Sequence, residues 1–293
     1  MRITRKNLFS VLRVPLILVA TVILILAFSV QAAHEKLVFK ADNLRRLSLD
    51  AMVKEIGSSR VITIGEQHGN NTHHQVQLLI INAIHGTGKD IAIGFEQFGA
   101  RSQKGLSSWT AGKSDIDDLF QIYSRDWEPN WWYLYLPVFQ YARAHEIPMV
   151  GLNVPREIVR QVAERGFSSL SSKQRGQIKV LSCSIDEKYQ EALRRILGQK
   201  GMDSEGEVFN RFCEAQVVWD TSMAINAVEY LKANPEKTLV ILAGNFHAWK
   251  RGIPEQVGRI SDVQVRSILP SEDPSFFNYD AFIEDSDYVW QIE

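Results

Sequence analysis

Cysteine is rare in this chain of 293 residues, which contains only Cys183 and Cys213. A framework of several disulfides is therefore excluded, and at most one intrachain disulfide can form. An oxidising compartment permits that bond. Two buried free thiols fit the sequence equally well, because the sequence gives no distance between the two Cα atoms. Internal repeats and low-complexity linkers are also absent, so a single domain is the simplest organisation.

An excess of positive charge is missing as well. The chain has 33 basic and 34 acidic residues, for a formal net charge of -1. The first 32 residues contain four of the basic residues and no acidic residue, so the remainder has 29 basic against 34 acidic residues. A nucleic-acid partner is therefore not expected, because binding to phosphates needs a basic surface.

The N-terminal segment combines basic residues with an apolar run from Val14 to Val30, interrupted only by Pro15, Thr21 and Ser29. Small residues follow, and this order is typical of a signal peptide, here residues 1–32. An uncleaved membrane anchor is the alternative, because a run of about 17 apolar residues is near the lower limit for crossing a bilayer. Both alternatives predict an exported protein, periplasmic or membrane-associated. No cysteine stands directly after the run, so no lipoprotein attachment point is expected.

Four short apolar segments of the chain end in acidic, amide or imidazole groups. The polar residues at their ends are Glu66 with His68, Glu96, Asn153, and Asn245 with His247. Apolar runs of this length are typical of buried strands in a parallel sheet. Because the carboxyl ends of parallel strands meet at one edge, where open α/β sheets bind ligands, the four segments predict a shared pocket.

Helical periodicity between and after these strands predicts the α/β class. Residues 74–85 have helical spacing between the first two strands, and such a β-helix-β unit favours a parallel, right-handed crossover. Further helices are expected at 103–109, 115–123, 131–145, from Pro155 onward and at 205–231, with further strands at 262–269 and, as an edge strand, 288–292. Residues 33–47 are expected to be a polar lead-in. We therefore expect residues 33–293 to form one α/β domain with a mostly parallel central sheet, flanking helices and a helical insertion at 166–203.

Glu66, His68, Glu96 and His247 are the candidate catalytic and metal-ligating residues. Imidazole and carboxylate groups bind divalent ions such as Zn, Mn, Fe or Co. The same groups can also work without a metal in general acid–base catalysis. A structural role, as a helix cap or a hydrogen-bonded loop residue, is the alternative for Glu66 and for the two histidines. Glu96 fits a structural role less well, because an unpaired carboxylate at a buried strand end is costly.

Other polar residues near these strand ends are candidate ligand-binding groups. Arg156 opens a helix and offers an anion site for a carboxylate or a phosphate, although a surface ion pair explains it equally well. Gln216 and Asp220 lie one turn apart beside the apolar stripe of the predicted helix at 205–231. Asn153 and Asn245 complete this group because each follows a predicted strand.

Aromatic residues are concentrated between residues 127 and 141. Packing in the core is the simpler explanation of such a cluster. Its functional alternative is a flat apolar surface on which Tyr133 and Tyr135 approach a porphyrin, because tyrosine is a known axial ligand of haem iron.

Several motifs around these residues lie between residues 60 and 260. They are IGEQH at 64–68, IGFEQF at 93–98, GLNVPR at 151–156, FCEAQVVWD at 212–220 with MA at 223–224, and AGNFH at 243–247 with GIP at 252–254. In them the sequence resembles the ChaN family, the haem-binding-uptake branch of the Tiki superfamily. The resemblance implies an exported protein that binds haem or another small ligand and takes part in iron uptake, and it leaves a homodimer open. Covalent haem is excluded because the chain has no CxxCH motif.

The wider superfamily implies a different function for the same residues. It includes metal-dependent proteases and erythromycin-esterase-like hydrolases, which use Glu and His at the positions matching Glu66, His68, Glu96 and His247. In such a hydrolase Glu66 and the two histidines would bind a divalent metal, with Glu96 as a further ligand or the general base. The metal would activate water and polarise a carbonyl. Hydrolysis without a metal is a third hypothesis, with His68 as the base. We favour a non-enzymatic haem- or iron-binding protein and keep the metal-dependent hydrolase as the alternative.

Overall fold

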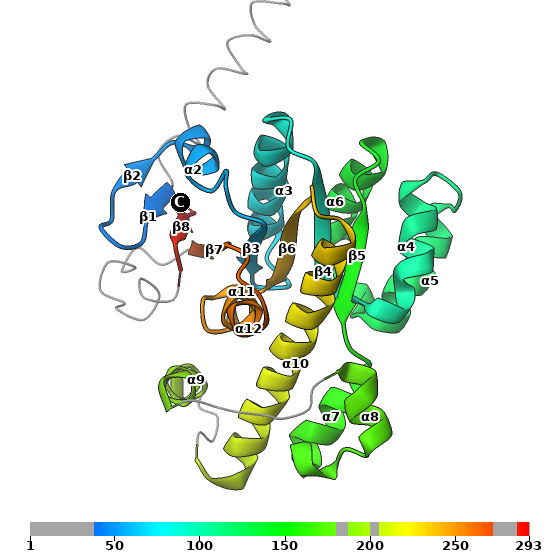
Figure 1. Ribbon diagram of the computed structural model, residues 1–293, viewed down its shortest axis with the longest axis vertical. Coiled ribbons are helices and arrows are strands. Elements are labelled where there is room, and N and C mark those ends of the chain that lie inside the picture. Colours follow the sequence, from blue (N-terminus) through cyan, green and yellow to red (C-terminus); the bar gives the residue numbers. More distant parts are fainter. Residues whose placement is uncertain (1–37, 180–186, 200–204, 272–285, 293) are drawn as a thin grey trace, which may run out of the picture.

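A computed structural model describes residues 38–179, 187–199, 205–271 and 286–292 of the chain. An eight-stranded sheet forms its centre and helices cover both faces (Figure 1). The order of the strands in the sheet is β2-β1-β8-β7-β3-β6-β4-β5. The segment expected to be a signal peptide or a membrane anchor lies outside the described residues. Within the described ranges, no helix is both long enough and apolar enough to cross a membrane.

The sheet is mostly parallel, as the sequence predicts. Its strands are β1 (Val38–Lys40), β2 (Arg46–Leu47), β3 (Val61–Glu66), β4 (Ile91–Gly99), β5 (Met149–Asn153), β6 (Thr238–Gly244), β7 (Val265–Ser271) and β8 (Tyr288–Gln291). The six strands from β8 to β5 are parallel to one another, and β8 is antiparallel to β1. Only β1 and β2, at one edge, pair antiparallel.

The central strands β3, β6 and β4 are buried along their whole length because helices pack on both of their faces. On one face, Val240 and Leu242 of β6 belong to the same apolar core as α3 (Asn71–Gly86) and α6 (Trp132–Ala144). On the other face, Leu239 and Ile241 pack with α10 (Gly206–Ala233) and α12 (Ile253–Ile260). Burial on both faces explains why these strands are continuous apolar runs in the sequence.

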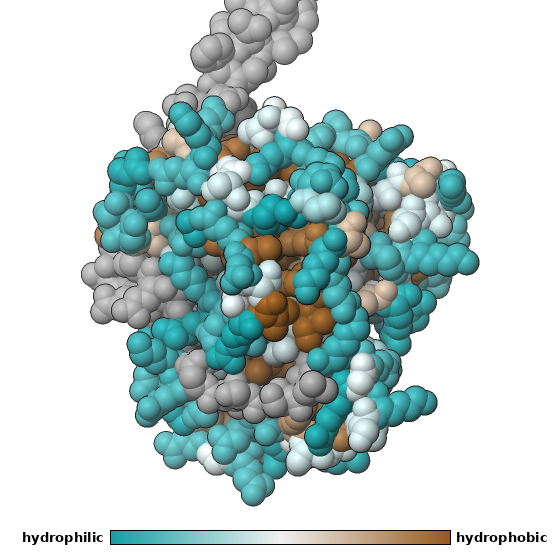
Figure 2. All heavy atoms as spheres, in the orientation of Figure 1, coloured by the Kyte–Doolittle hydropathy of each residue, from teal (hydrophilic) through white to brown (hydrophobic). Residues whose placement is uncertain are grey.

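The remaining helices lie around this three-layer centre. They are α2 (Leu49–Glu55), α4 (Gln103–Thr110), α5 (Ile116–Asp126), α7 (Arg156–Arg165), α8 (Ser172–Ile178), α9 (Glu187–Gln199) and the short α11 (Asn245–Ala248). The expected helical insertion is present as α8 and α9. Helix α10 continues past the sheet, and α7 and α8 pack on its extension in a separate apolar cluster (Figure 1). On the face of the molecule that Figure 2 shows, hydrophilic side chains dominate and hydrophobic atoms reach the surface mainly at its centre.

Two predictions about the ends of the domain are wrong. The segment expected to be a polar lead-in contains β1 and β2, which form the edge of the sheet. The strand near the C-terminus, β8, is therefore not an edge strand, because it lies between β7 and β1.

Cys213 is a buried free thiol, and burial raises its pKa to about 11. Cys183, the other half of the disulfide considered above, lies outside the described residues.

Candidate functional site

The predicted polar residues meet where β3, β6 and β4 end. Glu66, the last residue of β3, pairs in register with Gly244, the last residue of β6. Glu96 lies on the adjacent strand β4, and His247 follows β6 in α11. A Cβ on Gly65 would come within 2.3 Å of the Asn245 side-chain oxygen. Glycine at this position therefore lets the start of α11 lie directly against β3.

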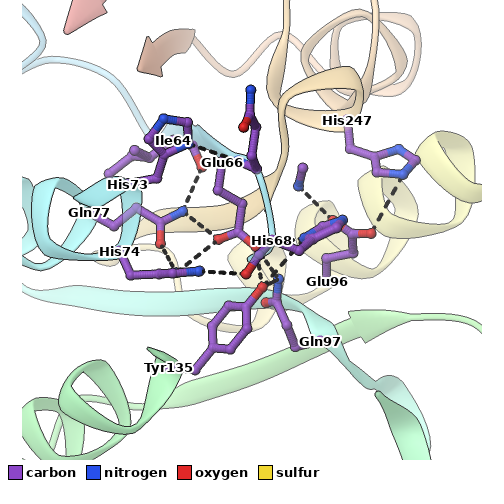
Figure 3. Close-up of polar contacts among 12 residues, drawn as sticks. Ile64, Glu66, His68, His73, His74, Gln77, Glu96, Gln97, Tyr135 and His247 are labelled. Carbon is purple, nitrogen blue, oxygen red and sulfur yellow. Dashed lines mark hydrogen bonds and ion pairs between the residues drawn. The ribbon is translucent and has the colours of Figure 1, made fainter. Parts of the chain in front are cut away.

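Glu66 and His68 form a carboxylate–imidazole pair. Their Oε1 and Nδ1 atoms are 2.7 Å apart, and the carboxylate is buried (Figure 3). Gln77 Nε2 donates a hydrogen bond of 2.7 Å to Oε2 of Glu66. Gln97 Nε2 (3.2 Å) and the Tyr135 hydroxyl donate to Oε1. Side chains from α3, β4 and α6 therefore fix the carboxylate that orients His68.

Hydrogen bonds keep Glu66 ionised although it is buried. Burial raises the pKa of Glu66, but the bond from His68 and the proximity of His74 outweigh burial and lower the pKa. Burial and the Glu66 charge raise the pKa of Tyr135 well above its usual value. Tyr135 therefore remains a neutral phenol whose hydroxyl donates a hydrogen bond to Glu66.

His247 and Asp220 form a second pair of the same kind on the other side of the site. Nδ1 of His247 is 2.7 Å from Oδ1 of Asp220, and both side chains are buried. Burial lowers the pKa of His247, but the charges of Glu96 and Asp220 outweigh burial and raise it to about 9. Burial raises the pKa of Asp220 to about 6. At neutral pH the pair is therefore an imidazolium with a carboxylate.

Glu96 lies between the two pairs. One of its oxygens is 3.6 Å from Nε2 of His247, and the other accepts a hydrogen bond of 2.7 Å from the Gly244 backbone N–H. Burial lowers the pKa of His68, but the charge of Glu96 and the bond to Glu66 outweigh burial, so the pKa is raised. Each imidazole thus has its Nδ1 on a buried carboxylate, which leaves Nε2 to meet a ligand or to transfer a proton.

Aromatic rings form the walls of the pocket above these groups. The pocket has a volume of about 350 Å³ and is lined by His68, Glu96, Trp127, Glu128, Trp131, Arg156, Gln216, Trp219, Gly244, Phe246 and His247. The ring centroids of Trp127 and Trp131 are 5.1 Å and 5.5 Å from that of His68. The Trp219 ring is 5.2 Å from the His247 ring. The His68 side chain keeps 28% of its surface exposed, against 6% for His247.

The structure brings most of the predicted site residues together, in different roles. Arg156 and Gln216 line the pocket, whereas Asp220 lies behind it as the partner of His247. Asn153 lies below it, where its Nδ2 donates a hydrogen bond of 2.7 Å to the Glu96 carbonyl. Its Oδ1 accepts a hydrogen bond from Trp219 Nε1. Asn245 lies against Gly65 rather than in the pocket wall.

The two candidate tyrosines have opposite environments on α6. Tyr133 is 67% exposed and does not line the pocket, whereas Tyr135 is fully buried behind Glu66.

The four predicted metal-ligating residues, Glu66, His68, Glu96 and His247, are not arranged as ligands of one metal ion, because Glu66 is instead a hydrogen-bond partner of His68. Among the described residues, no three His, Cys, Asp or Glu side chains are placed to hold one metal ion.

Sequence reasoning missed Gln77 and Gln97, which hold Glu66, and did not predict that Asp220 pairs with His247. Gln77 follows His74 by three positions on α3, so helical spacing indicates that both face the same side. Gln97 directly follows Glu96. The pairing of His247 with Asp220 gives no local signal, because the two residues lie on different helices and are 27 positions apart.

A family model identifies the family of this chain, and a solved structure has a similar fold. The family model described as haem-binding uptake, Tiki superfamily, ChaN matches residues 52–257. The structure of ChaN of Campylobacter jejuni, titled for cofacial haem binding, is similar in fold, with a TM-score of 0.69 and 20% identity over 86% of this chain and 95% of that chain. Comparison with the curated proteins gave no match.

Two more distant structures complete the comparison. An erythromycin esterase mutant in its open conformation has a TM-score of 0.47 and 14% identity, over 80% of this chain and 76% of that chain. The type III effector HopBA1 has a TM-score of 0.48 and 11% identity, over 84% of this chain and 93% of that chain. Neither likeness is strong enough to carry an argument. The family match covers more than half of the chain, and the chain therefore belongs to the ChaN family of haem-binding uptake proteins in the Tiki superfamily.

Proposed function

We propose that this chain is an exported haem-binding protein that takes part in haem or iron uptake. The observation that carries the proposal is the pocket at the strand ends, where a partly exposed imidazole lies between two tryptophan rings. Membership of the ChaN family supports the same ligand. The basic and apolar N-terminal segment supports export.

The residues of the pocket fit the chemistry of haem. Haem is a flat apolar ring with two carboxylates at one edge, so it needs apolar walls and a cation. Trp127, Trp131 and Trp219 supply the walls, and Arg156 supplies a cation that can pair with a carboxylate. When bound, haem would supply an iron that takes an axial ligand from the protein.

His68 is the side chain that best fits the role of axial ligand. A histidine that binds a metal usually donates its other N–H to a carboxylate, as His68 does to Glu66. His247 has the same type of partner but is almost completely buried. Tyr135 fits poorly, because burial and its bond to Glu66 oppose formation of the phenolate. Tyr133 is exposed but lies outside the pocket wall.

Titration of the purified chain with haemin tests the proposal. We expect a saturable shift of the Soret band with the wild-type chain, and a changed band position and weaker binding in a His68→Ala variant. His145→Ala is the matched control, because His145 is an exposed histidine outside the pocket, and it should bind as the wild type does. A wild-type chain that gives no Soret shift would refute haem binding. Fractionation of cells that express the full chain tests export, which retention in the cytoplasm would refute.

A second candidate function is metal-free hydrolysis of an ester or a related acyl compound. The observation that favours it is the convergence of the Glu66–His68 and Asp220–His247 pairs on Glu96. In its neutral form, which its raised pKa favours only toward higher pH, His68 can take a proton from water while the water oxygen bonds to the carbonyl carbon. The protonated His247 can give a proton to the leaving alcohol as its C–O bond breaks. Acid and alcohol are then released, and a proton passed from His68 to His247 restores both residues.

Turnover of aryl and alkyl esters, measured with and without a chelator, tests this second function. We expect turnover that a chelator leaves unchanged and that His68→Ala and His247→Gln each reduce by at least about 100-fold. Loss of turnover on chelation would instead support the metal-dependent hydrolase. No turnover with any ester, in a chain that binds haemin, would leave haem binding as the function.

A further inference from the structure

A second cavity adjoins the candidate site. It lies between α7 and α10, has a volume of about 600 Å³, and we call it the α7–α10 chamber. Its lining is Arg156, Glu157, Val159, Arg160, Ala163, Phe212, Ala215, Gln216 and Trp219. The side chains of Val159, Ala163, Phe212, Ala215 and Trp219 make much of this lining apolar. A chamber of this size can take a ligand, because small-molecule sites measure about 300–1,000 Å³.

The chamber and the pocket at the strand ends share part of their walls. Arg156, Gln216 and Trp219 line both cavities. Trp219 also connects them to the chemistry of the site, because its ring contacts His247 and its N–H donates to Asn153. A ligand that contacts these three shared residues can therefore extend from the pocket into the chamber.

Arg156 is the exposed charged residue of the chamber lining that has no ion pair among the described residues. The two other charged residues of the lining have partners: Glu157 is 3.8 Å from Arg101, and Arg160 is 3.9 Å from Glu164. Within the described residues, the Arg156 guanidinium has no ion pair and no hydrogen bond. Arg156 is also the first residue of α7, where the helix dipole and free backbone N–H groups favour an anion.

Gln216 gives an independent indication of a ligand. Its side chain is only 9% exposed and borders both cavities. In the described part of the chain, its amide has no hydrogen-bond partner. The amide atoms are not fully enclosed by protein, and they border the two cavities, where a bound molecule can reach them. A bound molecule with an oxygen near Arg156 would supply that partner.

We propose that the α7–α10 chamber binds the apolar part of an amphipathic carboxylate, whose carboxylate is held by Arg156 and Gln216. Phe212 and Trp219 contact the apolar part. Two sources carry this chemistry, the carboxylate edge of a porphyrin that also fills the pocket and a separate acyl chain. Because the chamber shares Arg156, Gln216 and Trp219 with the pocket, the porphyrin source rests on the proposed function, whereas the acyl source does not.

Binding of laurate, followed by isothermal titration calorimetry below its micellar concentration, tests the proposal. We expect saturable binding of one laurate per chain, and no binding of dodecyltrimethylammonium, which has the same apolar chain and the opposite charge. Arg156→Met should weaken laurate binding about tenfold or more, because a charge-assisted hydrogen bond is lost. Arg165→Met is the matched control, because Arg165 is an exposed residue at the end of α7 outside the chamber lining, and it should change the Kd by less than about twofold.

A second variant tests the chamber itself. Ala163 is an exposed residue of α7 whose side chain lines the chamber, so Ala163→Phe fills the chamber without disturbing the core. We expect this variant to weaken laurate binding at least about tenfold while its circular dichroism spectrum remains that of the wild type. Laurate binding that is absent, or that neither Arg156→Met nor Ala163→Phe weakens, would overturn the proposal.

Competition with haemin identifies the source of the carboxylate. If haemin displaces laurate, the chamber holds the carboxylate edge of a porphyrin. Arg156→Met should then weaken the binding of haemin as well as that of laurate. If both bind together, the chamber holds a separate acyl ligand. Haemin binding without laurate binding would refute this proposal and leave the proposed function intact. Laurate binding without haemin binding would refute the proposed haem binding and leave this proposal intact.

Discussion

Nδ1 of His247 lies 2.7 Å from Oδ1 of Asp220, which joins the short helix after β6 to the middle of the longest described helix. Both side chains are buried, and Tyr189 donates a hydrogen bond of 3.3 Å to the other carboxylate oxygen. Glu96 approaches the far side of the imidazole. Removing a charged histidine from between two buried carboxylates leaves them unpaired, so this contact connects the site to the stability of the fold.

The first prediction concerns the pH dependence of stability. The pKa of His247 is raised to about 9 in the folded chain, from a usual value near 6.5. The folded state therefore holds the proton more tightly, and this contribution is complete below about pH 6.5 and is lost as pH rises to about 9. We expect His247→Gln to lower the free energy of unfolding by about 1–3 kcal/mol at pH 6.

Urea denaturation of both proteins between pH 6 and pH 9.5 measures this effect. The difference between wild type and His247→Gln should be largest at pH 6 and should narrow toward pH 9. A difference that stays constant over this range would show that the proton on His247 is not bound more tightly in the folded state.

The second prediction separates the two tyrosines of α6. Tyr135→Phe removes the hydroxyl that donates to the buried carboxylate of Glu66 and also accepts from Gln97. We expect a loss of about 1–3 kcal/mol in the free energy of unfolding, because both partners stay buried. Tyr133→Phe is the matched control, since Tyr133 is exposed on the same helix, and should change stability by less than about 0.5 kcal/mol.

Haemin spectra of the same two variants add a functional measurement. If His68 is the axial ligand, the Soret maximum of both haem complexes should match the wild type. A displaced maximum in Tyr133→Phe alone would move the axial role to that exposed tyrosine.

The third prediction concerns the close approach of α11 to β3. A Cβ on Gly65 would lie 2.3 Å from Asn245 Oδ1 and 2.6 Å from Leu269 Cδ2, so Gly65→Ala forces these side chains apart. We expect a loss of about 1–3 kcal/mol, typical of overpacking a core. Because α11 carries His247, the variant should also weaken the histidine pair.

Gly86→Ala is the control for this substitution. Gly86 is the last residue of α3, and a Cβ there would meet no atom within 4 Å. Alanine favours the helix more than glycine does, so this variant should be unchanged or more stable by up to about 1 kcal/mol. Thermal unfolding of both variants measures the contrast, and equal destabilisation would contradict it.

The sequence predicted the strands of the site because each is apolar along its length and ends in polar groups. Glu66, Glu96 and His247 were placed together correctly, since the carboxyl ends of parallel strands share an edge. The tyrosine that hydrogen-bonds to Glu66 could not be predicted, because Tyr133 and Tyr135 both belong to an aromatic cluster and nothing in the local sequence shows which one faces Glu66. The short strands β1 and β2 were missed because two or three residues are too few to show a periodicity.

The last prediction concerns the carboxylate that orients His68. Glu66 accepts hydrogen bonds from Gln77, Gln97 and Tyr135 and pairs with His68. Glu66→Gln replaces an acceptor oxygen with an NH₂ group that faces donors, so a close donor–donor contact replaces a hydrogen bond. We expect a loss of about 2 kcal/mol or more in the free energy of unfolding. The variant should also have a lower pKa for His68, since Glu66 raises that pKa.

Glu128→Gln is the matched control, because Glu128 lines the same pocket but is only half-buried. NMR titration of the histidine ring protons measures the pKa of His68 in the three proteins. We expect a downward shift in Glu66→Gln and a much smaller change in Glu128→Gln. If the pKa of His68 is the same in Glu66→Gln and the wild type, Glu66 does not hold the imidazole in its charged form. His68 would then have to be oriented by Trp127 and Trp131, whose rings pack against it.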